Sequence, residues 1–299
     1  RVVLEVGQQS PWMSRVLEDL ELEVIVANPR KVALIYGSDN KSDQVDAERL
    51  ARLARLDPEL LHPVRHRRED TQATLAYLRS REVLVAARTK LINSVRGQVK
   101  ALGGRMPSCT AANFHLQADA LPELIEDALS PMMEAIGLLT EKIRHMNRVI
   151  KEFCREVYPE TEMFLDIDGV GPLTALTFLL TIEEPGRFRS SRAVGAYFGL
   201  RPKRDQSGDV DKQLSLTKAG DARVRTLLVQ AAHHILGPFG KDSDLRRWGM
   251  KLAERGGRGA KKKAVLAVAR KLAVLMHRLW VTGEVYEPLR NASRAEQAA

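Results

Sequence analysis

Three acidic residues, Glu5, Asp43 and Asp46, have the types and spacing that could bind a divalent metal ion. Glu5 follows an apolar run and would project from a strand, whereas Asp43 and Asp46 share one face at the predicted start of a helix. Brought together, these carboxylates would provide the oxygen ligands that Mg²⁺ prefers, and two such ions can clamp a phosphodiester. The alternative is structural, because aspartate at a helix start is favoured by capping and by the helix dipole.

A glycine-rich turn, Asp168-Gly169-Val170-Gly171-Pro172, precedes an apolar helix. A tight turn with proline at the first helical position exposes backbone N–H groups that could hold a phosphate, with Gly169 and Gly171 closest to the nucleic acid. Helix–hairpin–helix modules contact the DNA backbone in this way without reading sequence. The alternative is an ordinary turn between two packed helices.

A serine lies in a basic, polar segment at residues 200–220, which is predicted to be an exposed loop. Ser207 precedes Gly208, and a serine hydroxyl there could attack a phosphate if a base, a metal ion or strong positive charge assisted it. Ser215 is the next serine to consider. The same composition is typical of a flexible solvated turn. The cationic side chains that could stabilise the phosphate are Arg201, Lys203, Arg204, Lys212 and Lys218.

Several elements must position these residues. A strand–helix–strand–strand order is predicted for Val2 to Val6, Trp12 to Leu20, Val24 to Ala27 and Val32 to Tyr36. That order implies a parallel strand pair joined by a helical crossover. Ser42 or Asp43 should then cap a helix that ends before Pro58.

Two long helices are predicted next, one over residues 70–103 and one over residues 136–157. The second has apolar residues three and four apart, which indicates either a coiled coil or a helix in a bundle core. Its seam residues are Ile136, Leu139, Ile143, Met146, Ile150, Phe153 and Val157. A mostly helical domain begins near Pro159 and ends with a helix that follows a basic run containing Lys262.

The composition favours a nucleic-acid partner. The formal net charge is +9 and the pI is about 9.7, so a polyanion is the first partner to expect and an anionic membrane the second. No apolar run approaches the ~20 residues that span a bilayer. Cys109 and Cys154 have no metal-ligand or disulfide spacing, which predicts a reducing, cytoplasmic setting.

In order along the chain, these segments resemble the bacterial insertion-sequence transposases with an N-terminal RuvC-like domain and a C-terminal serine domain. The N-terminal matches are Val3-Leu4-Glu5 and Lys41-Ser42-Asp43-Gln44-Val45-Asp46-Ala47. The C-terminal matches are the 168–172 turn, Arg187-Phe188, Tyr197-Phe198-Gly199-Leu200-Arg201-Pro202, Ser207-Gly208, Thr217-Lys218-Ala219-Gly220, Arg223-Val224-Arg225, Lys263 and Ala269-Arg270-Lys271.

The resemblance implies an α/β plus mostly α fold in four parts. These are a partial RuvC-like (RNase H) DEDD domain at 1–65, a helical coiled-coil region at 66–158, a helical serine domain with a helix–hairpin–helix-like turn at 159–290, and a polar tail at 291–299. It also implies DNA strand exchange in the bacterial cytoplasm, with Ser207 forming a phosphoserine–DNA intermediate. Glu5, Asp43 and Asp46 would hold Mg²⁺.

The resemblance further implies three kinds of partner: element-end and target DNA, a structured guide RNA from the element, and further copies of the chain. The expected nucleic-acid contacts are Gly169, Gly171, Arg201, Lys203, Arg204, Lys218, Arg223 and Lys262. Two other functions fit the residues: a Mg²⁺-dependent junction nuclease that uses no serine, and a non-catalytic DNA-binding module built on the glycine turn.

The chain departs from the family pattern at two places. The usual Gly-Gly-Lys after the serine is Gly208-Asp209-Val210 here, so the local charge is less basic. The first aspartate of the family's acidic set lies on an earlier strand, and this chain begins at Arg1 in what is predicted to be a later strand. We therefore expect about 50 upstream residues with that aspartate to be needed for full activity.

Overall fold

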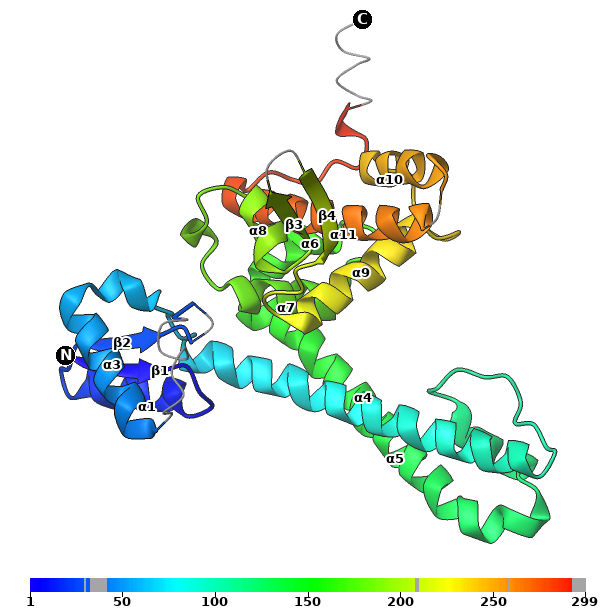
Figure 1. Cartoon of the computed structure of the whole chain (residues 1–299). Helices are drawn as coiled ribbons and strands as arrows, with labels where there is room; N and C mark the ends of the chain where they lie inside the picture. Colours follow the sequence, from blue (N-terminus) through cyan, green and yellow to red (C-terminus); the bar gives the residue numbers. More distant parts are fainter. Residues whose placement is uncertain (30, 33–41, 208–209, 258, 292–299) are drawn as a thin grey trace, which may run out of the picture. The chain divides into compact units, whose positions relative to one another are not determined.

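The computed structural model describes residues 1–29, 31–32, 42–207, 210–257 and 259–291, with the backbone alone described for residues 207 and 210–213. The chain divides into two compact units, Arg1–Gln72 and Ala73–Ala299. Figure 1 shows the elements. They are β1 (Val2–Glu5), α1 (Ser10–Asp19), β2 (Val24–Ala27), α3 (Asp43–Leu56), η1 (Pro58–Leu61), α4 (Glu69–Ala101), η2 (Phe114–Ala120), α5 (Glu123–Glu152), η3 (Phe153–Val157), η4 (Pro159–Thr161), α6 (Glu162–Leu165), α7 (Pro172–Ile182), η5 (Pro185–Arg187), α8 (Arg192–Tyr197), β3 (Pro202–Ser207), β4 (Val210–Leu216), α9 (Ala222–Leu236), α10 (Asp244–Glu254) and α11 (Ala260–Thr282).

The first unit is a small α/β arrangement. Strands β1 and β2 pair in parallel from Val2 opposite Val24 to Glu5 opposite Ala27, with α1 as the crossover, which confirms the predicted order. The strand predicted at Val32 to Tyr36 lies almost wholly outside the described residues. The core of this unit is small, and its buried members are Ile25, Ala27, Val32, Leu50, Ala54 and Leu61.

Helix α3 begins and ends where its sequence predicts. Ser42 has extended backbone angles, and its Oγ accepts a hydrogen bond from the Val45 N–H at 3.3 Å. This satisfies one of the N–H groups that a helix start leaves without a partner. The helix ends at Leu56, and Pro58 begins the next turn of 3₁₀ helix, η1.

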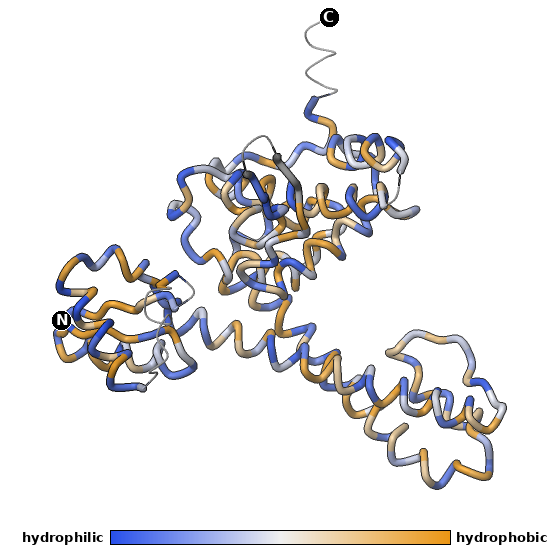
Figure 2. The backbone as a smooth tube through the Cα atoms, viewed as in Figure 1, coloured by the Kyte–Doolittle hydropathy of each residue, from blue (hydrophilic) through white to orange (hydrophobic). Residues whose placement is uncertain are grey.

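Helices α4 and α5 form an antiparallel helical hairpin. Three contacts fix its register: Arg81 Nε donates to Asn147 Oδ1 at 2.6 Å, Arg88 Nη1 donates to Thr140 Oγ1 at 3.1 Å, and Gln98 Nε2 contacts Met132 Sδ at 3.9 Å. Figure 2 shows hydrophobic and hydrophilic residues alternating along both helices. The seam predicted for α5 therefore pairs with α4 of the same chain.

The observed seam differs in detail from the predicted one. Thr140 is fully buried and Leu139 only partly, because Thr140 accepts the hydrogen bond from Arg88. The regular α-helix ends at Glu152 and continues as one π-helical turn, η3. A π-helical turn holds more residues than an α-helical turn, which rotates the buried face of the helix. As a result, Cys154 is buried and Val157 is 56% exposed. The prediction that Val157 extends the seam was wrong.

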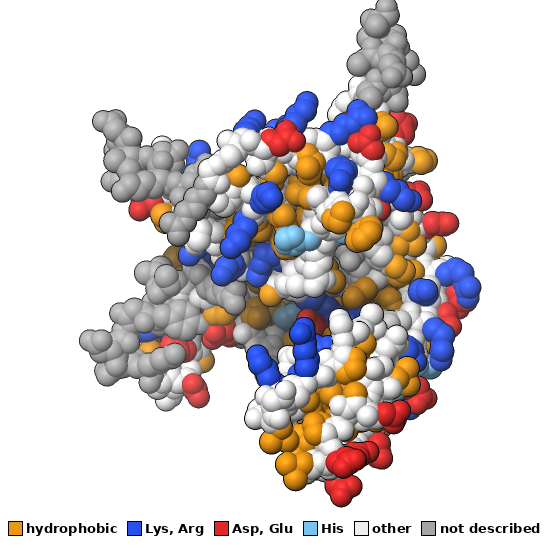
Figure 3. Space-filling model, turned by 90° about the vertical axis from the view of Figure 1, so that its right-hand side faces the viewer, with side chains coloured by type: hydrophobic (Ala, Val, Ile, Leu, Met, Phe, Trp, Pro, Cys, Tyr) orange, Lys and Arg blue, Asp and Glu red, His pale blue; other side chains and the backbone are white. Residues whose placement is uncertain are grey.

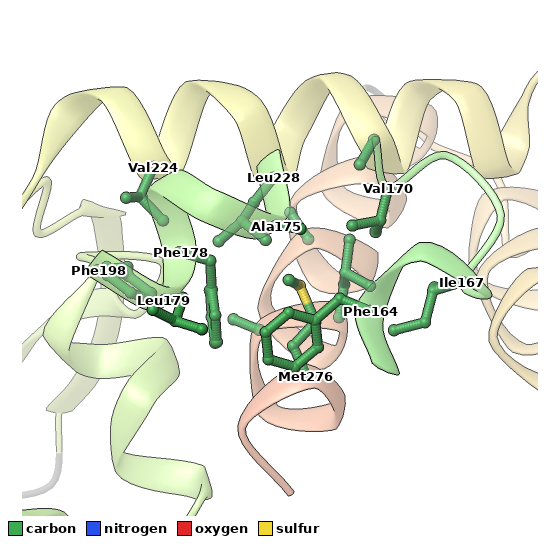
Figure 4. Packing of buried hydrophobic residues seen from close by; sticks show 14 of the residues in the cluster. Phe164, Ile167, Val170, Ala175, Phe178, Leu179, Phe198, Val224, Leu228 and Met276 are labelled. Carbon is green, nitrogen blue, oxygen red and sulfur yellow. The ribbon is translucent and has the colours of Figure 1, made fainter. Parts of the chain in front are cut away.

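The remainder of the second unit packs around α7, in which every residue from Thr174 to Ile182 is buried. Figure 4 shows Phe178 between Phe164 and Phe198, and both ring pairs have centroids 5.6 Å apart. Met276 of α11 and Leu228 of α9 belong to the same cluster. Leu75 and Leu78 of α4 and Ile150 of α5 also belong to it, so the helical hairpin and the C-terminal helices share one core.

The described part of the chain is mostly helical, with two small two-stranded sheets. The second compact unit begins at Ala73. It contains almost all of the helical region predicted at 66–158 and the whole serine domain predicted at 159–290. The tail predicted at 291–299 lies outside the described residues from residue 292 onward. Among the helices that the structure describes, none is both long and apolar enough to cross a membrane.

Candidate functional site

The three predicted metal ligands lie in the first unit. Glu5 is the last residue of β1 and is exposed. Asp43 is the exposed first residue of α3, and Asp46 lies one turn further along and is half-buried. Both aspartates are in the first turn of a capped helix, so the structural explanation for their positions holds as well.

One hydrogen bond indicates how these carboxylates are arranged. Arg1 Nη1 donates to Ala54 O at 3.1 Å, which joins the start of β1 to the last turn of α3. From this point Glu5 lies about 13 Å along the strand at roughly 3.3 Å per residue. Asp46 lies about 12 Å back along the helix at roughly 1.5 Å per residue. Helix α3 packs against β1, and the Arg1 contact joins the start of β1 to the end of α3.

The carboxylates nevertheless do not form a compact ligand cluster. Within the described ranges, no group of three or more His, Cys, Asp or Glu side chains is close enough to hold one metal ion. One observation does fit a cation: Asp46 Oδ1 is buried and has no hydrogen-bond partner among the described residues. A buried carboxylate oxygen without a partner is costly, and a cation would remove that cost.

The glycine turn between α6 and α7 is partly directed into the protein. Gly169 has a φ of +82°, and a Cβ placed on it would lie 2.9 Å from Ala231 O of α9. Beside it, Asp168 Oδ2 accepts a hydrogen bond from Lys241 N at 2.8 Å, and Asp168 Oδ1 lies 3.4 Å from His234 Nε2. Packing therefore accounts for Gly169, whereas Gly171 is exposed with open space around it and stays a predicted phosphate contact.

The segment predicted to be a flexible loop is instead a β-hairpin. Strands β3 and β4 pair antiparallel, and Ser207 is the last residue of β3, opposite Val210. The two residues between them, Gly208 and Asp209, lie outside the described residues, as does the side chain of Ser207. The loop prediction was wrong because both faces of the strands carry polar residues, so the sequence shows no apolar alternation. The signal that could have indicated a hairpin is the Gly-Asp pair, a typical two-residue hairpin connection.

The base of this β-hairpin is fixed by close backbone contacts. Gly220 has a φ of +69°, and a Cβ there would lie 2.0 Å from Tyr197 O. Thr217 N donates to Arg201 O at 2.9 Å. Arg225 Nη1 donates to both Phe198 O and Ala219 O at 2.9 Å, so α9 holds the two ends of the hairpin together. The sequence match at Arg225 was noted, but this positioning role was not predicted.

The predicted nucleic-acid contacts divide into two groups. Most are exposed and remain predictions: Arg201, Lys203, Arg204, Lys218 and Lys262. Figure 3 shows Lys and Arg side chains spread over the C-terminal domain on the face in view.

Arg223 is the exception among these residues. Its side chain is only 13% exposed, its Nη1 lies 3.4 Å from Glu82 Oε2, and its Nη2 donates to Leu78 O. Burial lowers the pKa of the Arg223 guanidinium, and Glu82 acts in the opposite direction. Arg223 thus joins α9 to α4, and a contact of this residue with nucleic acid stays a prediction.

Comparison with known proteins covers both units. Residues 1–103 match the DEDD transposase domain of IS110 elements, and residues 161–244 match the transposase IS116/IS110/IS902 family. The chain is 30% identical over 236 residues to the transposase for insertion sequence element IS1328 of Yersinia enterocolitica, covering 77% of this chain and 69% of that protein. The chain belongs to the IS110/IS116/IS902 family of transposases. The recognised resemblance is confirmed at this level.

Other relatives extend the same match. The transposase for insertion sequence element IS1111A of Coxiella burnetii is 29% identical over 267 residues, which cover 84% of this chain and 70% of the relative. The pilin gene-inverting protein of Moraxella bovis is 25% identical over 261 residues, which cover 85% of this chain and 71% of that protein. Within the present chain, Glu5, Asp43 and Asp46 lie in the 1–103 segment that matches the DEDD transposase domain. Ser207 lies in the 161–244 segment that matches the IS116/IS110/IS902 family.

Proposed function

We propose that this transposase exchanges DNA strands through a covalent bond between Ser207 and DNA. The observation that carries the proposal is the position of Ser207 at the end of β3, in a hairpin whose base is held rigidly by α9. Strand pairing places the backbone of Ser207 opposite Val210. The exposed Lys203 and Arg204 on the same strand supply positive charge for a phosphodiester.

The proposed reaction conserves the phosphodiester. Ser207 Oγ attacks phosphorus, an Oγ–P bond forms, and the P–O bond to one strand end breaks. The serine proton is transferred, directly or through water, to the leaving oxygen. A hydroxyl of a second strand then attacks the phosphoserine, which regenerates Ser207 and completes the exchange without an external energy source.

Glu5, Asp43 and Asp46 are the residues that would hold Mg²⁺ in an RNase H-like domain. The buried, unpartnered Oδ1 of Asp46 supports this assignment. Mg²⁺ would stabilise negative charge on the phosphate oxygens. Asp46→Asn should therefore lose strand exchange while the melting temperature stays within a few degrees of that of the unsubstituted chain.

We further propose that the transposase acts as a multimer on element-end and target DNA with a structured guide RNA, in the bacterial cytoplasm. The basic net charge of +9 supports a nucleic-acid partner. The relation to proteins named as insertion-element transposases supports DNA as the substrate.

The deciding experiment looks for a covalent adduct. Labelled element-end DNA is incubated with the transposase, and the mixture is resolved in SDS. We expect an SDS-stable adduct that is abolished by Ser207→Ala and retained by Ser190→Ala, an exposed serine outside the hairpin. An adduct lost only in Ser215→Ala would move the nucleophile to Ser215.

Two other outcomes would replace the proposal. Mg²⁺-dependent cleavage without an adduct would favour a metal-dependent junction nuclease. Binding with neither cleavage nor adduct would favour a non-catalytic DNA-binding protein that uses the glycine turn.

A further inference from the structure

A pocket of about 800 Å³ lies between the base of the β-hairpin and helix α11, and is hereafter called the hairpin pocket. Figure 1 shows β3 and β4 beside α11. The hairpin contributes Pro202 and residues 214–216, and Leu200 lies just before it. Helix α10 contributes Trp248. The volume is within the range of roughly 300–1,000 Å³ that small-molecule sites occupy.

One stripe of α11 forms the long wall of the pocket. Its lining residues recur every three or four positions, as the face of one helix must: Lys263, Leu266, Ala267, Arg270, Lys271 and Val274. Leu266, Ala267 and Val274 give this wall apolar surface, and Lys263, Arg270 and Lys271 alternate with them along the helix. Leu200, Pro202 and Trp248 add further apolar surface to the lining, which suits a flat ring.

Among the side chains that the structure describes, every charged residue that lines the hairpin pocket is positive. These residues are Arg192, Lys263, Arg270 and Lys271. Within the described part of the chain, none of the four forms an ion pair. No described carboxylate pairs with these four cations, so their positive charge is not neutralised by the described part of the protein. They therefore attract an anion.

Two of these cations are held in place by their neighbours. The Arg270 side chain runs over Gly195 of α8, where an added Cβ would lie 2.8 Å from Arg270 Cγ. Lys271 Nζ lies 4.3 Å from the ring centroid of Trp248, a cation–π contact. The cations are therefore positioned before a ligand arrives, which reduces the entropy lost on binding.

We propose that the hairpin pocket holds one unpaired nucleotide of a DNA strand, with its base against the apolar lining residues and its flanking phosphates against the four lining cations. The proposal rests on the proposed function, since it assigns a subsite to the same substrate. A base stacked in a duplex cannot enter a pocket of this kind, so the nucleotide must be unpaired or turned out of the helix.

The position of the pocket relates the nucleotide to the proposed nucleophile. Pro202 and Ser207 are the two ends of β3, about 16 Å apart at roughly 3.3 Å per residue. That length equals about five nucleotide rises of 3.4 Å in B-form DNA. An unpaired nucleotide in the pocket would thus fix the strand a few nucleotides from the phosphate that Ser207 attacks.

The test compares a substitution that fills the pocket with a matched one outside it. Ala267→Phe places a ring in the pocket, and Val281→Phe adds the same ring to an exposed position of α11 (55% exposed). The full chain is titrated with a labelled 12-nucleotide single-stranded DNA and with the duplex of the same length. We expect Ala267→Phe to weaken single-strand binding by roughly 5- to 150-fold, the range for loss of one stacked base, and to leave duplex binding within about twofold.

A second measurement on the unsubstituted chain is independent of folding in the variants. A 12-nucleotide strand with abasic sites keeps every phosphate but has no bases, so it should bind at least about fivefold more weakly than the normal strand. Equal affinity for both strands, or equal single-strand binding by the two phenylalanine variants, would overturn the proposal. An Ala267→Phe effect confined to RNA of the same sequence, or to an acidic peptide, would also overturn it.

This outcome is separable from that of the adduct experiment. Ala267→Phe loses single-strand affinity even if no serine adduct ever forms. Conversely, an adduct at Ser207 with unchanged single-strand binding would reject the pocket assignment and leave the nucleophile in place.

Discussion

The α4–α5 helical hairpin and the β3–β4 hairpin begin at the same core but are held together in different ways. In the first, apolar residues three and four apart bury a continuous seam, and side-chain hydrogen bonds such as that of Arg81 with Asn147 set its register. In the second, the residues are mostly polar, and backbone pairing with glycine contacts at the base sets the shape. The comparison teaches that a buried seam makes a stable arm, while a polar hairpin fixed at its base can present functional groups to a substrate.

The largest effect should come from charging the helical seam. Ile143 and Ile150 are 3% and 2% exposed, so Ile143→Asp with Ile150→Asp should lower the free energy of unfolding by about 5 kcal/mol or more, because each aspartate would be buried without a partner. Urea unfolding followed by circular dichroism measures this. The matched pair Leu124→Asp with Leu138→Asp, at positions 83% and 56% exposed, should change it by less than about 0.5 kcal/mol each.

This substitution also distinguishes pairing within the chain from pairing between chains. Because the seam faces α4, we expect loss of stability in the single chain rather than only a smaller multimer. A normal unfolding curve with a reduced mass in light scattering would show that the seam pairs between chains instead.

The base of the β-hairpin should be the next most sensitive region. Gly220→Ala meets Tyr197 O, whereas Gly256→Ala has a similar φ of +73° with nothing within 4 Å. Both alanines carry the strain of a positive φ, roughly 1–2 kcal/mol. Gly220→Ala should therefore cost at least about 2 kcal/mol more than Gly256→Ala, since the backbone at Tyr197 must also move. Equal melting temperatures would mean that the close approach at Gly220 is relieved without cost.

A smaller effect should appear at the register of the helical hairpin. Arg81 and Asn147 form a charged hydrogen bond of 2.6 Å. In a double-mutant cycle with Arg81→Ala and Asn147→Ala, we expect a coupling free energy of about 1.5–3 kcal/mol, as is typical of hydrogen bonds to charged groups. Arg79→Ala with Asn147→Ala, which lacks such a contact among the described residues, should show no coupling.

The smallest effect concerns pH and the core from which both hairpins begin. His277 is 1% exposed, its Nε2 lies 3.0 Å from Pro185 O and its Nδ1 lies 2.9 Å from Ser191 Oγ. Burial lowers the pKa of His277, and the hydrogen bond to Pro185 acts against this. The unfolded chain therefore binds the proton more readily than the native protein does.

It follows that stability from neutral His277 is present above the unfolded pKa of about 6.5 and is lost as the pH falls below it. Between about pH 7.5 and about pH 5.5, the free energy of unfolding should therefore fall more in the unsubstituted protein than in His277→Gln. Parallel pH profiles for the two proteins would show that His277 does not titrate in this range.

The candidate site could be predicted only in part from the sequence. The acidic residues and Ser207 were found through an ordered set of short motifs, and the family matches now cover them. The motifs could not reveal that Arg223 is turned inward onto Leu78 and Glu82, because that contact joins residues far apart in the chain. Nor did any local pattern indicate that Arg192, Trp248 and α11 line one pocket with the hairpin base.

The sequence by itself determined the elements whose cause is local. Apolar spacing predicted β1, α1, β2, α4 and most of α5, and the cap at Ser42 marked the start of α3, because these features depend on neighbours within one turn or one strand. Tertiary structure decided the register of α4 against α5, the pairing of β3 with β4, the inward side of the Gly169 turn and the hairpin pocket. Each of these depends on contacts between segments that are distant in the chain, which no local sequence pattern determines.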